Sequence, residues 1–120
     1  MYQKIRQISD MVWKSPNEFG KLAVTAWADM PNTNEELGFI IWYTLHHGIW
    51  AKKAVKSVII QLCKTYPRIT IPEMVGWIQL PYQRIRSLCL ELVNEGQIRQ
   101  ERDRAIVSSK GNCPSILWTV

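Results

Sequence analysis

Cysteines are few in this 120-residue sequence, and long apolar runs are missing. Cys63, Cys89 and Cys113 are odd in number and include no Cys-x-x-Cys pair, which argues against a disulfide framework or a structural zinc site. The longest strongly apolar run, 38–45, is far shorter than the roughly 20 residues that cross a bilayer. The first residues lack the continuous apolar stretch of a secretory signal. We therefore expect no membrane segment, a cytoplasmic protein, and Cys63 and Cys89 as small core residues.

Enzyme signatures are also missing. The sequence has no Gly-rich phosphate loop, no His-x-x-x-His pair and no nucleophile elbow. His46 and His47 are adjacent, so on a helix they point about 100° apart and do not easily hold one ion together. We expect them to interact with the end of their helix instead. The sequence predicts no catalytic residue, no metal and no cofactor.

The charge balance is mild. Fifteen Lys and Arg against ten Asp and Glu give a net charge of +5, and the excess is spread along the chain rather than gathered in a basic tail. This balance permits an anionic partner without requiring one. At 47% hydrophobic residues, the chain has enough apolar content for a folded core.

Apolar residues recur at helical spacing in several stretches, and these predict a mainly α protein. The predicted helices span about 2–13, 17–29, 34–47, 50–66, 71–78 and 81–95. The second is expected to begin at an Asn17 N-cap, and capping boxes are expected at Thr33–Glu36 and Thr70–Glu73. After Gly96, β-branched residues and a turn at 110–114 predict two or three short strands up to residue 120.

The C-terminal part carries an ordered set of positions around its last predicted helix. They are Glu73-Met74-Val75, Leu80-Pro81, Ile85 and the exit Leu92-Val93-Asn94-Glu95-Gly96-Gln97-Ile98. Over about 51–120 this order resembles the winged helix-turn-helix DNA-binding family. The turn position that is usually Gly in that family is Gln79 here, and a left-handed backbone there costs about 1 kcal/mol, which would favour a rearranged turn.

The resemblance implies a recognition helix at 81–95 and a β-hairpin wing after it. Ile85, Leu88 and Leu92 share one face of this helix, and the opposite face is polar. Arg pairs bidentately with guanine and Gln with adenine, which suits that face to the major groove. The expected base-reading residues are Tyr82, Gln83, Arg84, Arg86 and Ser87. The expected phosphate-binding residues of the wing are Arg99, Arg102, Arg104 and Lys110.

A second, shorter resemblance lies before the helix at 50–66. Gly48, Ile49, Trp50, Lys52 or Lys53, and Ala54 match the G-[LI]-W-x-[RK]-[RK]-A signature of the small PerC-type transcriptional activators of enterobacteria and their prophages. This similarity also implies a role in regulation.

The expected organisation is an N-terminal helical segment, 1–48, followed by a winged helix-turn-helix, 49–120. The run Phe39-Ile40-Ile41-Trp42-Tyr43 is apolar around the whole helix, which a small monomer would struggle to bury. We therefore expect the helices at 18–29 and 34–47 to form much of a homodimer contact. The expected function is that of a sequence-specific regulator of transcription, of bacterial, plasmid or phage type, that binds double-stranded DNA.

Acidic residues leave a second interpretation open. Four carboxylates lie among the basic side chains of this region, at Glu91, Glu95, Glu101 and Asp103. In addition, Leu90 is expected on the outward face of the recognition helix. A winged helix that binds protein, as an adaptor or inhibitor of host machinery, fits these features, and a replication-initiation accessory role is a variant of the DNA-binding interpretation.

Overall fold

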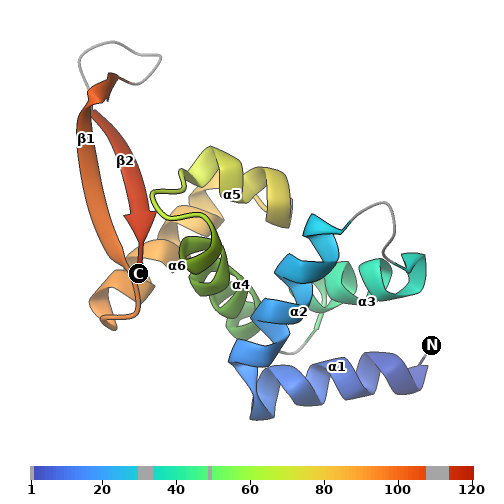
Figure 1. Ribbon diagram of the computed structural model, residues 1–120. Helices are drawn as coiled ribbons and strands as arrows, with labels where there is room; N and C mark the ends of the chain where they lie inside the picture. Colours follow the sequence, from blue (N-terminus) through green and yellow to red (C-terminus); the bar gives the residue numbers. More distant parts are fainter. Residues whose placement is uncertain (1, 30–33, 49, 108–113) are drawn as a thin grey trace. The chain divides into compact units, whose positions relative to one another are not determined.

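The computed structural model describes residues 2–29, 34–48, 50–107 and 114–120 (Figure 1). The described chain is mainly helical, with six α-helices and one two-stranded antiparallel sheet. The helices are α1 (Tyr2–Lys14), α2 (Pro16–Ala28), α3 (Glu35–His46), α4 (Ala51–Thr65), α5 (Ile71–Ile78) and α6 (Tyr82–Asn94), and the strands are β1 (Arg99–Val107) and β2 (Pro114–Thr119). This arrangement confirms the mainly α fold expected from the hydrophobic periodicity.

The chain forms two compact units, residues 1–61 and 62–120, which divide within α4. In the first unit, α1 packs against both α2 and α3. The apolar side of α1 is buried at Ile8 and Val12, which lie four residues apart, as the helical period requires. Gly20 of α2 lies against the backbone of α4 at Ser57, where a Cβ atom would stand only 2.7 Å from the Ser57 carbonyl oxygen.

Two helix starts differ from the sequence expectation. Helix α2 begins at Pro16 with Ser15 as its N-cap, so the Asn17 cap was wrong. Proline suits the first turn because its missing N–H would have no partner there. Thr33 lies outside the described residues, and the N-cap of α3 is Asn34, whose Oδ1 accepts the N–H of Glu36 at 2.7 Å.

The start and end of α5 are both defined by local chemistry. Thr70 and Glu73 form the predicted capping box, in which the Thr70 hydroxyl accepts the Glu73 N–H and the Glu73 carboxylate accepts the Thr70 N–H. At the other end, Gln79 has φ 62° and ψ 41° and donates its N–H to the Val75 carbonyl at 2.8 Å. Gln79 therefore adopts the left-handed conformation although it is not glycine. The turn is not rearranged to avoid this conformation, in contrast to the expectation from the sequence.

The strands β1 and β2 pair from Arg99 with Thr119 to Val107 with Pro114, with an irregularity between 103 and 107. A single bridge extends this sheet, because Trp118 donates its N–H to the Ile69 carbonyl at 2.9 Å. The expected two or three short strands after Gly96 correspond to two strands among the described residues, and the bridging residue Ile69 lies outside that stretch.

The core of the second unit gathers side chains from helices and strand. Its largest fully buried members are Leu62, Ile69, Met74, Ile78, Ile85, Leu88, Leu92 and Trp118. Cys63 and Cys89 are also buried and carry free thiols, as expected, and burial raises the pKa of each thiol to about 12. Cys113 lies outside the described residues.

Candidate nucleic-acid interface

Helix α6 has one apolar and one polar face, and the apolar face is buried. Ile85, Leu88, Cys89 and Leu92 are all at most 1% exposed. Cys89 contacts α5 through its thiol, which donates to the Met74 sulfur at 3.6 Å. This packing fixes the rotation of α6 and therefore determines which side chains point outward.

The first half of α6 points polar side chains into solvent. Tyr82 is 46% exposed, and the four expected base-reading residues beside it are exposed as well. They are Gln83, Arg84, Arg86 and Ser87. Within the described part of the chain, no residue forms a hydrogen bond or ion pair with these four side chains. Toward the described residues, the donors needed for base edges or phosphates are therefore uncommitted.

The N-terminus of α6 adds backbone donors to this face. Its N-cap is Pro81, which offers no side-chain acceptor, and the first turn contains no acidic residue. The first N–H groups of the helix are thus not capped by a side chain, and the helix dipole gives this end a partial positive charge. An uncapped helix start beside Arg84 and Arg86 suits an anionic group.

Acidic side chains on α6 are confined to its second half. Glu91 is half-buried in the last turns and Glu95 is the exposed C-cap. Leu90, expected on the outward face, is half-buried. The charges of α6 are therefore segregated along its length, with the arginines at the start and the carboxylates at the end.

The expected wing residues have different outcomes. Arg99 is exposed, and its Nη2 donates a hydrogen bond to the backbone carbonyl of Val120 at 3.2 Å. Part of its guanidinium is therefore already engaged in linking the two ends of the hairpin. Arg102 and Arg104 lie in β1, but their side chains are outside the part of the chain that the structure describes. Lys110 lies outside the described residues altogether.

A further basic residue beside the hairpin was not found from the sequence. Arg68 has a positive φ of 67° and its Nε lies 3.8 Å from Oε2 of Glu101 on β1. The pairing follows from the bridge at Ile69, which joins residues far apart in the chain. No local pattern signals a bridge of one residue, so sequence periodicity did not place Arg68 near the wing.

The adjacent histidines lie at the end of α3, where the sequence placed them. His46 is in the last turn and His47 is the C-cap. The His46 ring stacks on Trp42 with centroids 4.7 Å apart, and the His47 ring lies 5.4 Å from that of Tyr43. Among the described residues, no cluster of three His, Cys, Asp or Glu side chains is placed to hold a metal ion.

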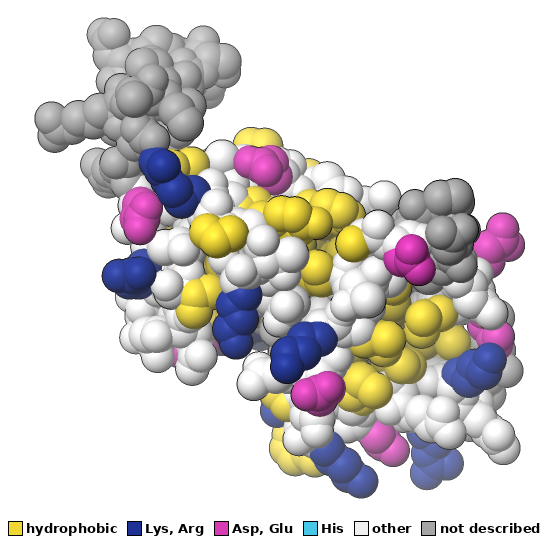
Figure 2. Space-filling model, viewed as in Figure 1, with side chains coloured by type: hydrophobic (Ala, Val, Ile, Leu, Met, Phe, Trp, Pro, Cys, Tyr) yellow, Lys and Arg dark blue, Asp and Glu magenta, His cyan; other side chains and the backbone are white. Residues whose placement is uncertain are grey.

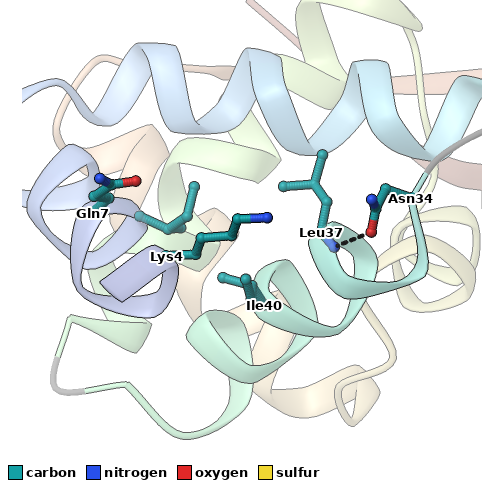
Figure 3. A pocket seen from close by; sticks show the side chains of 6 residues that line it. Lys4, Gln7, Asn34, Leu37 and Ile40 are labelled. Carbon is teal, nitrogen blue, oxygen red and sulfur yellow. Dashed lines mark hydrogen bonds between the residues drawn. The ribbon is translucent and has the colours of Figure 1, made fainter. Parts of the chain in front are cut away.

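A pocket of about 320 Å³ lies between α1 and the first turns of α3 (Figure 3). Its lining mixes polar and apolar side chains, among them Lys4 and Leu37. Lys4 also forms an ion pair with Glu36 at 2.9 Å. This contact lowers the pKa of the Glu36 carboxyl, through the hydrogen bond and then the charge of Lys4. The Glu36 carboxylate therefore neutralises the charge of the lysine that lines this pocket.

Basic side chains are dispersed on the face of the molecule shown in Figure 2, and acidic ones lie among them. None of the described helices is long and apolar enough to cross a bilayer. Comparison with protein-family models, curated proteins and solved structures finds no match to the chain.

Proposed function

We propose that α4 to β2 form a winged helix-turn-helix domain and that the protein is a sequence-specific regulator of transcription that binds double-stranded DNA. The single observation that carries this proposal is the first half of α6, where exposed polar side chains stand over a fully buried apolar face. The element order supports the same proposal, because a short capped helix, a tight turn at Gln79, a longer helix and a hairpin follow one another. The bridge from Ile69 to Trp118 joins one further residue to the edge of the hairpin.

In this proposal, the start of α6 enters the major groove. Gln83, Arg84, Arg86 and Ser87 then face base edges, and each good bidentate pair contributes about 1–3 kcal/mol of discrimination. DNA phosphate oxygens then lie near the uncapped N–H groups of the helix and along the hairpin. There, Arg102 and the other expected wing cations contact the DNA backbone. The phosphate contacts hold the register, and the contacts of α6 read the sequence.

Fluorescence anisotropy with genomic DNA fragments and random duplexes, at about 50 and about 200 mM salt, tests the proposal. Arg84→Ala or Arg86→Ala is expected to cost about 1–3 kcal/mol on a preferred site and to relax the preference at one base pair. Arg102→Ala is expected to weaken all sequences alike and to lower the salt slope by about one unit. Arg6→Ala is the matched control, because it removes an exposed arginine from α1 and changes the net charge equally.

A protein-binding winged helix is the second candidate, and the exposed Tyr82 with the carboxylates at the end of α6 favours it. Tyrosine and arginine are enriched at protein interfaces, and carboxylates repel the phosphates of DNA. Absence of DNA binding by the folded parent at low salt would refute the regulator and leave this candidate. Equal binding by the parent and by both folded α6 variants would show that DNA binds elsewhere.

A further inference from the structure

Helix α3 presents a row of large aromatic side chains to solvent. Phe39, Trp42 and Tyr43 are 44%, 39% and 37% exposed, whereas Ile40 and Ile41 between them are buried. Successive helical residues are rotated by about 100°, so the three rings lie on the side opposite the buried face. Together with His46 and His47 we call them the α3 stripe. Folding of the first unit leaves this stripe uncovered.

The rings of the α3 stripe already pack against one another. The ring centroids of Phe39 and Trp42 are 6.3 Å apart, those of Phe39 and Tyr43 are 6.1 Å apart, and Trp42 also contacts both imidazoles. Side chains held in such a cluster lose little rotamer freedom when a partner docks on them. Exposed Trp and Tyr in this state have the properties of interface hot spots.

The two ends of α3 carry different polar groups. Glu35 is exposed in the first turn, one helical turn before Phe39 on the same side, and His46 and His47 occupy the other end. Helix α3 has no Lys or Arg, and its first turn is acidic, which disfavours DNA and anionic lipid on the stripe. When the same helix runs in the opposite direction, the Glu35 carboxylate can accept a hydrogen bond from the imidazole of His47 at the other end.

We propose that a second copy of this chain docks on the α3 stripe, with the two α3 helices antiparallel across a two-fold axis. Ile41 is midway between Glu35 and His47, so the axis passes beside Trp42 and Tyr43, and Glu35 lies opposite the partner's His47. Antiparallel helices also place opposite dipole ends together. A two-fold contact satisfies both ends with one pair of surfaces. The twelve residues of α3 span about 18 Å, which suits a dimer of modest affinity. This proposal does not depend on DNA binding.

The first test is sedimentation of the parent, a Trp42→Ala variant and a Trp13→Ala control from about 1 to about 200 micromolar, a range that covers weak interfaces. Trp13 is a more exposed tryptophan, on α1 and outside the stripe. We expect a parent dimer whose dissociation constant rises at least about 30-fold in Trp42→Ala and stays unchanged in Trp13→Ala. A parent that remains monomeric, or a dimer that tolerates Trp42→Ala, would overturn the proposal.

The second test fixes the direction of the helices. Glu35→Lys removes the acceptor that faces the partner's His47, and His47→Glu places a carboxylate opposite the partner's Glu35. Each change occurs twice in a two-fold dimer, so each should weaken self-association about 5-fold or more. An equimolar mixture of the two variants should form a heterodimer, because one contact then joins the introduced lysine to the introduced glutamate and the other is native. Failure of the mixture to associate, with both variants folded by circular dichroism, would refute the antiparallel arrangement.

Discussion

The close approach of α2 to α4 gives a sharp test of the packing in the first unit. A Cβ atom added at Gly20 would lie 2.7 Å from the Ser57 carbonyl oxygen, 3.1 Å from the Ser57 carbonyl carbon and 3.3 Å from Cβ of Gln61. Most of these atoms belong to the backbone of α4, which cannot move aside like a flexible side chain. Gly20→Ala therefore requires the two helices to separate or α4 to distort.

The expected cost follows from two opposing effects. Overpacking a well-packed interior costs about 1–3 kcal/mol, and contact with helix backbone places Gly20→Ala toward the upper end of that range. Alanine recovers about 1 kcal/mol over glycine inside a helix. The net effect should be a loss of about 1–2 kcal/mol in the free energy of unfolding. Gly38→Ala is the matched control, because Gly38 also lies within a helix of this unit but has nothing within 4 Å of the added Cβ atom.

Urea unfolding followed by far-UV circular dichroism measures both variants at low protein concentration. We expect the midpoint to fall for Gly20→Ala and to rise for Gly38→Ala, by about 0.5–1 kcal/mol in the second case, with unchanged m-values. If Gly20→Ala stabilised the protein as much as Gly38→Ala, α2 and α4 could not approach at this point, and the packing of the first unit would be refuted.

Three further predictions concern the second unit. Gln79→Gly should raise the free energy of unfolding by up to about 0.6 kcal/mol in a urea titration, because relief of about 1 kcal/mol of left-handed backbone strain is offset by about 0.4–1 kcal/mol of added entropy in the unfolded chain. Ile85→Ala should lower it by about 2–5 kcal/mol, since the side chain is fully buried, and a smaller loss would contradict that burial. Burial raises the pKa of the Cys63 and Cys89 thiols to about 12, above their unfolded values, so the folded state favours the protonated thiols. The stability they contribute should therefore be lost as pH rises from about 9 toward 12, by up to about 1.4 kcal/mol per thiol and pH unit, and Cys63→Ala should make urea unfolding less sensitive to pH over this range.

Helices could be predicted from the sequence because their signal is local and repeated. Their exact starts were harder, because several capping residues compete within a few positions. At the start of α2, Ser15 is the cap and Asn17 lies inside the helix, since Pro16 fits the first turn. At the start of α3, Asn34 holds two N–H groups with one side-chain oxygen, which makes it the cap of that helix.

Contacts between distant residues could not be predicted from one sequence. The bridge from Ile69 to Trp118 involves one residue on its first side, too few for any period to appear. The ion pair of Arg68 with Glu101 depends on that bridge. The sequence likewise showed that 39–43 is apolar all round, but only the packing against α1 and α2 decides that the isoleucines point inward and the aromatic rings outward.

Net charge is a poor guide to the candidate interface, because the position of each charge on α6 matters more than the total. Counting side chains between Arg84 and Lys110 gives six basic and four acidic ones. Arg84 and Glu95 are separated by about 16 Å along the helix axis, which is about twice the Debye length of roughly 8 Å at physiological salt, whereas Glu91 is only about 10 Å from Arg84. Under those conditions Glu95 therefore weakens the attraction of an anion to the start of α6 only slightly, and Glu91 weakens it more. They act over a longer range at low salt, so a salt titration reports on this segregation of charge as well as on phosphate contacts.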